Sequence, residues 1–418
     1  MQRHKEFIFF VPLLLQAMQY IFLTIIYFFL TASLAAQDMQ NVRAYIDTLA
    51  APGMHGRGYV NNGDKIAANY LEGRFQETGL MPFNNSAQAH PFFQYFKVDI
   101  NTFPGALCFK AGNHLLQPGK DFILNPASGS GKGAMSVRLL DTMLFCSKKI
   151  QKKFLNTKST SLALVFESKN LKQIQSLPKN LYDKFYSFGC LIELQEKKLT
   201  ASLAPYQLRQ PYFEIKKEAF PLKTQKISLE VDAELKKKYE SQNVIGYIKG
   251  KKIPDSFMVI SAHYDHLGRM GKDIYFPGAN DNASGISMLL ELAKYYSKAE
   301  NQLDYSIAFI AFGAEEAGLI GSKHYVDNPL FPLKKIKFLI NLDLLGTGEE
   351  GITVVNGTKF PAQFEKLVQL NEEKKYLTSI KQRGPAANSD HYFFTEKGVP
   401  AFFIYTMGGI AASMTSLT

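Results

Sequence analysis

Short apolar runs alternate with amphipathic segments over the C-terminal part of the chain, from about residue 241. The amphipathic segments "SGISMLLELAKYY" and "PAQFEKLVQLNEE" place apolar residues at intervals of three and four, which predicts helices. The apolar runs "NVIGYI", "FMVISAH", "SIAFIAFG", "KFLINLD" and "PAFFIY" are nearly continuous, which is typical of strands buried on both faces. This alternation predicts an α/β fold with a mainly parallel sheet covered by helices on both faces.

Two other patterns precede this part of the chain. Residues 38–84 have helical spacing in "NVRAYIDTLA" and "DKIAANYLEGRFQETGL", joined by the Gly-rich link "APGMHGRGYVNNG". Residues 85–240 hold short β-prone runs separated by Gly, Pro and Lys clusters, which predicts an inserted, mostly β subdomain. Its segment "PASGSGKGA" lacks the first glycine and the final Ser or Thr of a phosphate-binding loop, so we expect a flexible loop there.

The N-terminus has the pattern of a secretory signal peptide over residues 1–36. Basic residues precede a long apolar stretch, and the small residues of "TASLAAQD" follow it. This order predicts cleavage near Ala35 or Ala36 and a secreted or periplasmic protein. The alternative is a membrane anchor that is not cleaved, because the stretch is long enough to span a bilayer.

Composition narrows the class of protein. The chain has 418 residues, of which 46% are apolar, so it can build a large core. The formal net charge of +11 comes with lysines in short scattered clusters and without an Arg-rich arm or a nucleic-acid motif. We therefore expect solvated lysine faces, no nucleic-acid partner and no specific protein partner, with membrane contact only through an uncleaved N-terminus. The three cysteines fit no zinc or redox motif.

Polar residues follow the predicted strands at their carboxyl ends, where parallel sheets bind ligands. Taken singly, each has an ordinary explanation, such as a helix N-cap for an aspartate. Together they mix imidazole with carboxylate, a set of donors that suits Zn²⁺ or a related divalent ion. The residues concerned are His263, Asp265, Asp281, Glu315, Glu316, Asp343, Asp390 and His391.

The residue types suggest roles. His263 and Asp265 are two positions apart, so in a strand both would point to one face, and the Asp265 carboxylate could receive the imidazole N–H. Asp281, in the tight turn "PGANDNASG", could bridge two metal ions about 3.5–4 Å apart. In "AEEAG", one of Glu315 and Glu316 could bind metal while its neighbour takes a proton from water.

These motifs resemble the M28 family of co-catalytic zinc aminopeptidases. The matching text is "HYDHLG", "PGANDNASG", "FGAEEAGLIGSKHYV", "INLDLLG" and "NSDHYFFTEKGVPAFF". The resemblance implies that residues 241–418 are the zinc peptidase catalytic domain, with a mixed sheet between helices, and that 38–84 are its helical lead-in. Residues 85–240 stand where some members carry a protease-associated insert.

The resemblance also implies two zinc ions. His263 and Asp343 would hold one of them, Asp281 would bridge, and Glu316 would hold the second. His266 is expected to be structural or to line the pocket.

The remaining roles follow from the same resemblance. Glu315 would be the general base, and Asp265 would orient the ligand His263. Asp390 and His391 would be polar residues of the substrate pocket. The substrates implied are the N-termini of peptides or proteins.

The chain departs from the family after the "GVPAFF" strand. The family carries a further histidine there, the last ligand of the second zinc, whereas this chain reads "YTMGGIAASMTSLT". Either the tail is truncated or read out of frame, or the protein is a natural variant with an impaired second site. In this chain, Glu316 and Asp281 leave the second zinc with two protein ligands instead of three, so we expect it to bind more weakly. The main hypothesis is therefore a secreted zinc aminopeptidase. Its alternatives are a catalytically impaired binding module and, on a related fold, a glutaminyl cyclase.

Overall fold

The structure of the protein is a computed structural model that describes residues 38–84 and 87–409. The predicted signal peptide and the tail 410–418 lie outside the described residues. Within the described ranges, no helix is both long enough and apolar enough to cross a membrane.

The larger sheet of the described chain has nine strands. Its order is β1–β11–β15–β12–β16–β19–β17–β18, and β2 also pairs with β11. The strands are β1 (Met81–Pro82), β2 (Phe93–Thr102), β11 (Glu234–Ile248), β12 (Ile253–His263), β15 (Tyr305–Phe312), β16 (Ile336–Leu342), β17 (Gly351–Val355), β18 (Ile380–Gln382) and β19 (Ala401–Met407).

The centre of this sheet is parallel and its flanks are mostly antiparallel. Strands β15, β12, β16 and β19 run parallel to one another, whereas β11 is antiparallel to β15 and β17 is antiparallel to β19. The predicted mixed α/β class is therefore confirmed, and its parallel part is the four central strands. Their carboxyl ends meet at one edge, where the polar residues were expected to gather.

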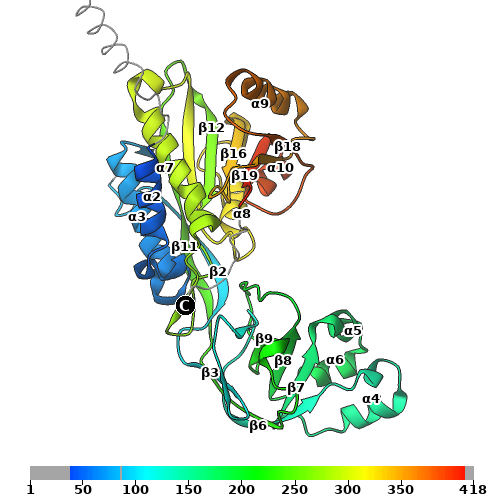
Figure 1. Ribbon diagram of the computed structural model, residues 1–418. Helices are drawn as coiled ribbons and strands as arrows, with labels where there is room; N and C mark the ends of the chain where they lie inside the picture. The colour runs from blue at the N-terminus through cyan, green and yellow to red at the C-terminus, as the bar shows by residue number, and fades with distance from the viewer. Residues whose placement is uncertain (1–37, 85–86, 410–418) are drawn as a thin grey trace, which may run out of the picture. The chain divides into compact units, whose positions relative to one another are not determined.

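Helices cover both faces of the sheet, as Figure 1 shows. Helices α2 (Met39–Leu49), α3 (Gly63–Glu77) and α7 (Ser284–Ser297) pack on one face, and α8 (Ile320–Asp327) and α10 (His391–Glu396) pack on the other. Neighbouring residues of β12 point to opposite faces of the sheet. Ile260 packs in the core with α3 and α7, and Val259 packs in the core with α8 and α10. Burial on both sides explains why this strand reads as a continuous apolar run. Helix α9 (Pro361–Lys374) packs through Phe364 and Leu367 beside β17 and β18.

Residues between β2 and β11 form a second, eight-stranded sheet in the order β4–β3–β10–β6–β7–β8–β9–β5. Its strands are β3 (Leu107–Ala111), β4 (His114–Leu116), β5 (Phe122–Leu124), β6 (Gly131–Leu139), β7 (Leu162–Glu167), β8 (Cys190–Gln195), β9 (Tyr212–Lys216) and β10 (Lys226–Val231). Helices α4 (Lys148–Leu155), α5 (Leu171–Gln175) and α6 (Lys179–Phe185) accompany it, and β13 (Arg269–Met270) pairs with β14 (Ile274–Tyr275) elsewhere.

This second sheet differs in two ways from the segment expected over 85–240. Strand β2 lies inside that range but pairs with β11 in the larger sheet. The loop expected over 126–134 ends early, because β6 begins at Gly131 and pairs with β10. The domain boundaries themselves stay a prediction.

Candidate metal centre and active site

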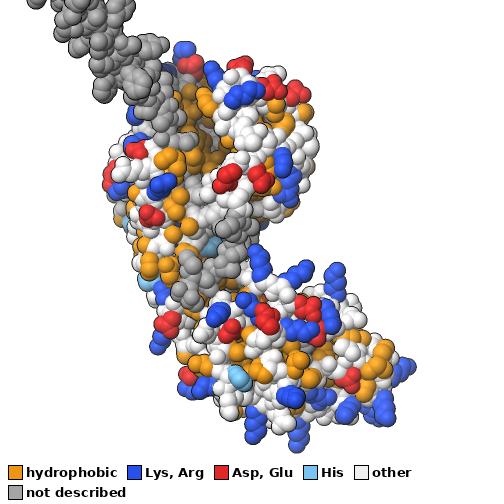
Figure 2. Space-filling model, in the orientation of Figure 1, with side chains coloured by type: hydrophobic (Ala, Val, Ile, Leu, Met, Phe, Trp, Pro, Cys, Tyr) orange, Lys and Arg blue, Asp and Glu red, His pale blue; other side chains and the backbone are white. Residues whose placement is uncertain are grey.

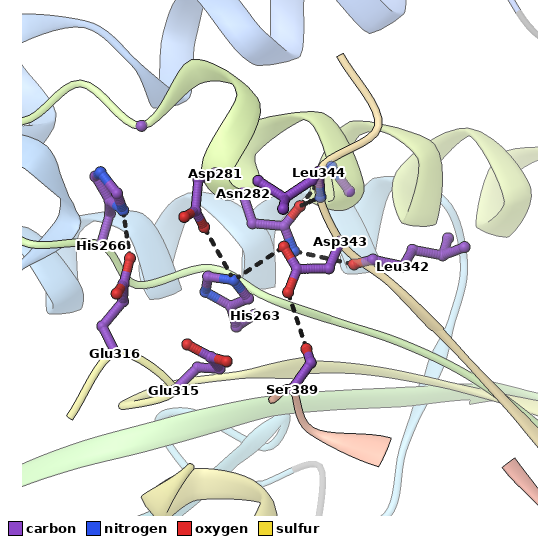
Figure 3. Close-up of polar contacts among 12 residues, drawn as sticks. His263, His266, Asp281, Asn282, Glu315, Glu316, Leu342, Asp343, Leu344 and Ser389 are labelled. Atoms are coloured by element: carbon purple, nitrogen blue, oxygen red, sulfur yellow. Dashed lines mark hydrogen bonds and ion pairs between the residues drawn. The ribbon is translucent and has the colours of Figure 1, made fainter. Parts of the chain in front are cut away.

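Carboxylates and imidazoles converge at the carboxyl ends of the parallel strands (Figure 3). His263 is the last residue of β12, and Asp343 directly follows β16. Glu315 and Glu316 follow β15, and Asp281 lies in the turn before α7. Segments far apart in the sequence thus bring five predicted residues to one edge of the sheet, and their side chains group together there.

The imidazole of His263 stands between two carboxylates. Its Nε2 atom is 3.3 Å from Asp281 Oδ1 and 3.4 Å from Asp343 Oδ1. Two ligands of one tetrahedral zinc, each about 2.0–2.1 Å from the ion, are about 3.3 Å apart. His263, Asp343 and Glu315 form one group whose possible ligand atoms all lie within 4.8 Å of one another. The spacing and the donor types therefore fit a zinc ion.

Hydrogen bonding also fits a cation at Nε2. The other ring nitrogen, Nδ1, lies 3.1 Å from the backbone carbonyl oxygen of Asp265, which can only accept. A proton on Nδ1 leaves Nε2 to hold either a second proton or a metal ion against the carboxylates. Burial alone would lower the pKa of His263, but the charges of Asp343 and Glu315 outweigh it and raise this pKa well above its usual value.

Asp343 is oriented by a chain of buried polar side chains. Ser261 Oγ donates to Asn341 Oδ1, Asn341 Nδ2 donates to Ser389 Oγ, and Ser389 Oγ donates to Asp343 Oδ2, each at 2.8 Å. The other carboxylate oxygen, Oδ1, is buried and accepts no hydrogen bond. It faces His263, so it is free to bind a metal ion (Figure 3). Ser389 was not singled out from the sequence, although it directly precedes Asp390 in "NSDHYFF".

Asn282 joins the Asp281 turn to the end of β16. Its Nδ2 donates to the Leu342 carbonyl at 2.9 Å, and its Oδ1 accepts from the Leu344 N–H at 3.3 Å. These bonds flank Asp343 on both sides in the sequence. The amide of Asn282 therefore fixes the two carboxylate-bearing segments against each other.

A second group consists of His266, Asp281 and Glu316. The Nδ1 atom of His266 is 2.6 Å from Glu316 Oε1, and the His266 side chain is 3% exposed. The sequence assigned His266 only a structural or pocket-lining place. The signal that points to this contact is the second histidine of "HYDHLG", three residues after His263.

The Asp265 carboxylate does not accept the hydrogen bond expected from the His263 ring, although the two groups are within ion-pair distance. It lies 3.8 Å from His263 Nδ1, and the backbone carbonyl of Asp265 takes that position instead. The reason is that β12 ends at His263, so strand alternation does not extend to residue 265. The carboxylate accepts instead from the N–H groups of Glu315 at 3.0 Å and Glu316 at 3.3 Å. It thus positions the glutamate pair.

Glu315 is a half-buried carboxylate among other carboxylates. Burial raises its pKa well above the usual value, and the charges of Asp390 and Asp343 raise it further, while His263 opposes them. Burial likewise raises the pKa of Asp390 to about 7. A group with such a raised proton affinity suits general-base work better than an exposed glutamate does.

Asp390 and His391, expected in the substrate pocket, are buried. Asp390 is 0% and His391 1% exposed. Burial lowers the pKa of His391 to about 4, and its ring lies 5.4 Å from that of Phe403. Neither residue belongs to a metal-binding group of the described chain. Their contact with substrate stays a prediction.

Comparison with known proteins agrees with this geometry. Residues 243–414 match Peptidase family M28. Aminopeptidase YwaD of Bacillus subtilis (strain 168) is 34% identical over 207 residues, which are 48% of this chain and 43% of that protein. An aminopeptidase of Pseudomonas aeruginosa (strain UCBPP-PA14) is 37% identical over 125 residues, 29% of this chain and 22% of that protein. The chain thus spans less than half of the length of these relatives.

A solved structure shares the fold. The chain superimposes on BSAP, a zinc aminopeptidase from Bacillus subtilis, with a TM-score of 0.65 and 22% identity, covering 90% of this chain and 88% of the other. On this fold, the clustered imidazoles and carboxylates are donor types that suit a zinc ion. The match to Peptidase family M28 covers residues 243–414, less than half of the chain.

Proposed function

We propose that the protein is a zinc-dependent aminopeptidase that hydrolyses N-terminal peptide bonds. The observation that carries the proposal is the placement of His263 Nε2 at 3.3–3.4 Å from two carboxylates, inside a family M28 domain. The names of the relatives support the choice of an exopeptidase acting on amino termini.

We assign the metal ligands by group. His263 and Asp343 would hold one zinc ion, and Asp281 would be shared with a second ion held by Glu316. His266 lies beside this second position. When bound, zinc lowers the pKa of water and polarises the scissile carbonyl. The idea of a weakened second site concerns the tail 410–418, outside the described residues.

Glu315 is the proposed general base. It accepts a proton from the attacking water and passes it to the leaving amine. Asp265 holds the backbone N–H groups of Glu315 and Glu316, so the two carboxylates keep separate tasks. Ser389 and Asn282 hold the ligand-bearing segments while the proton moves.

The proposal includes export. The basic, apolar and small-residue order of residues 1–36 supports a signal peptide, although these residues lie outside the described structure. The expected result is a mature chain that begins near residue 37 in the exported fraction, measured by N-terminal sequencing.

The activity is tested with a panel of aminoacyl p-nitroanilides and their N-acetylated forms. We expect release of p-nitroaniline and a free amino acid only from substrates with a free α-amino group. A chelator should stop the reaction and added zinc should restore it. A folded, zinc-supplied protein that cleaves none of the free substrates would contradict the proposal. Equal cleavage of the acetylated forms would contradict the exopeptidase assignment.

A further inference from the structure

Arg57 is a fully buried arginine in the link between α2 and α3. It ends the short helical turn η1 (Pro52–Arg57), and its side chain is 0% exposed. Burial lowers the pKa of Arg57 to about 10, so the guanidinium is still charged at neutral pH. A buried charged group is tolerated in a fold only when its N–H donors have hydrogen-bond acceptors. The acceptors of the Arg57 guanidinium therefore indicate what the residue does.

All five N–H donors of the guanidinium have acceptors, and every acceptor is a backbone carbonyl. Nε donates to Tyr264 O at 2.7 Å, Nη1 to Leu49 O at 2.8 Å and Pro277 O at 2.7 Å, and Nη2 to Gly278 O at 2.8 Å and Asp281 O at 3.2 Å.

Four of these carbonyls belong to the segments that carry the proposed metal-binding side chains, and the fifth, Leu49 O, ends α2. Tyr264 directly follows His263, and the carbonyls of residues 277–281 belong to the turn that carries Asp281. The backbone of Arg57 adds to this connection, because its carbonyl accepts from the His266 N–H at 3.3 Å. One side chain therefore joins the end of β12 to the Asp281 turn.

The turn is also shaped around the guanidinium. Gly278 has a φ of +58°, which favours glycine. A Cβ at this position would lie 2.5 Å from Arg57 Nη2 and 2.3 Å from the Asp281 carbonyl oxygen. Only glycine therefore lets the turn approach the guanidinium this closely.

The charge of Arg57 has no carboxylate in direct contact within the described residues. Its positive charge is felt instead by Asp281, Asp265 and Glu316, the carboxylates around the proposed metal positions. A fixed cation among them offsets their mutual repulsion before metal binds.

We propose that Arg57 is a positioning residue of the metal centre, and that four of its hydrogen bonds hold the Asp281 turn against the end of β12. His263 and Asp281 then keep the 3.3 Å spacing that suits shared binding of a zinc ion. This inference rests on the proposed function, namely that these two residues bind zinc.

The test compares zinc affinity in variants of the full chain. Arg57→Lys keeps the charge but offers three donors in place of five, so at least two carbonyls lose their partner. Loss of a residue that orients metal ligands typically costs about 10–100-fold in metal affinity. We expect a loss of that size for Arg57→Lys, measured by competition with a zinc-binding dye. The rise in melting temperature on adding zinc should shrink accordingly.

The control is Glu193→Gln, which removes a buried charge from the second sheet, away from the site. It should leave zinc affinity unchanged. If Arg57→Lys does not fold, Gly278→Ala is the second variant. It keeps the guanidinium, but its Cβ would press on Arg57 Nη2, the Asp281 carbonyl and the His266 ring, so it is unchanged zinc affinity in the folded variant that counts against the role of Arg57.

The possible failures are distinguishable. A folded Arg57→Lys or Gly278→Ala variant with wild-type zinc affinity overturns the role of Arg57 and leaves the proposed function standing. A folded wild-type protein that binds no zinc overturns the proposed function, and the role of Arg57 with it.

Discussion

At the residue level, the two neighbouring glutamates have separate proposed tasks: Glu315 takes the proton and Glu316 binds metal. Asp265 accepts from the backbone of both, so the two side chains leave the same short turn in fixed directions. Glu316 meets His266, whereas Glu315 groups with His263 and Asp343. The two neighbours therefore serve different positions in the site.

Glu315→Gln is expected to lower turnover by about 10²–10⁴-fold, the range of general-base catalysis. Zinc content should be unchanged, because the amide keeps the size of the carboxylate and the assigned ligands remain. The matched control is Glu316→Gln, which should lose zinc. Elemental analysis of both variants, beside their rates, checks the assignment, and loss of zinc from Glu315→Gln would show that Glu315 is a ligand.

Ser389→Ala is expected to weaken zinc binding by about 10-fold, because Asp343 loses the hydroxyl that orients it. The control is Ser159→Ala, which removes a buried hydroxyl, between α4 and β7, that is hydrogen-bonded to the Ser187 hydroxyl. Zinc titration of both variants makes the comparison. Equal affinities in Ser389→Ala and wild type would show that the Asp343 carboxylate needs no such support.

Much of the site could be predicted because each strand ends in a polar residue. The contacts that were missed depend on geometry after the strand ends. Asp265 contacts the glutamate backbone rather than the His263 ring, and period-two alternation carries no information beyond residue 263. Arg57 lies more than 200 positions from its Tyr264 and Gly278 acceptors, so no local pattern indicates its role.

At the scale of elements, α3 is fixed to β11 by a buried carboxylate. Asp64, in the first turn of α3, accepts from the Tyr239 hydroxyl at 2.7 Å and from Ser241 Oγ at 3.0 Å. Burial raises its pKa to about 6, although both hydrogen bonds oppose the shift. Ionisation of Asp64 therefore lowers the free energy of unfolding of the protein.

The sign of the pH dependence follows. Because the folded pKa of about 6 exceeds the unfolded value of about 3.9, the folded state holds more protons between these values. Stability from Asp64 is complete below about pH 4 and falls by roughly 2–3 kcal/mol as pH rises through 6. Asp64→Asn has no carboxylate at this position, so its free energy of unfolding should not fall in this way. The stability of the variant relative to wild type should therefore rise between pH 4 and 6. Urea unfolding of both zinc-free proteins at pH 4 and at pH 6 measures this change. A difference in unfolding free energy between variant and wild type that does not depend on pH would contradict the role of Asp64.

The strands of the parallel centre could be predicted because both of their faces are buried. Strand β11 was harder, since its first half reads "ELKKKYESQN" and bulges between Lys236 and Tyr239 where it pairs with β2. This half of β11 is a strand because it pairs with β2, which lies over a hundred residues away in the sequence. It has no apolar pattern that would predict a strand. Tertiary pairing of this kind overrides local composition.

At the scale of the whole molecule, the second sheet shares its core with the segment that follows β12. Leu267, Met270 and Phe276 pack into the core of the second sheet, and the Leu124 N–H donates to Met270 Sδ at 3.3 Å. This segment joins His263 to Asp281. The second sheet thus supports the loop that carries the metal ligands.

Surface charge is distributed rather than concentrated. On the face drawn in Figure 2, Lys and Arg side chains lie over the second sheet and its helices, with Asp and Glu side chains between them. This mixture agrees with lysines that are solvated.

Phe276→Ala is expected to cost about 3–5 kcal/mol of stability, as buried aromatic truncations do, and to weaken zinc binding as well. The control is Phe185→Ala, which empties a separate core beside α6. It should cost similar stability without changing zinc affinity. Chemical unfolding and zinc titration of both variants check this, and unchanged zinc affinity in Phe276→Ala would show that the second sheet does not support the site.

The most direct measurement is zinc per folded chain, by elemental analysis of the purified protein supplied with zinc. The account predicts two zinc ions, one at His263 and Asp343 and one at Glu316, with Asp281 shared. It also predicts that His263→Ala loses zinc and that Glu193→Gln does not. A folded protein that retains no zinc would contradict the metal centre, and with it the peptidase function built on it.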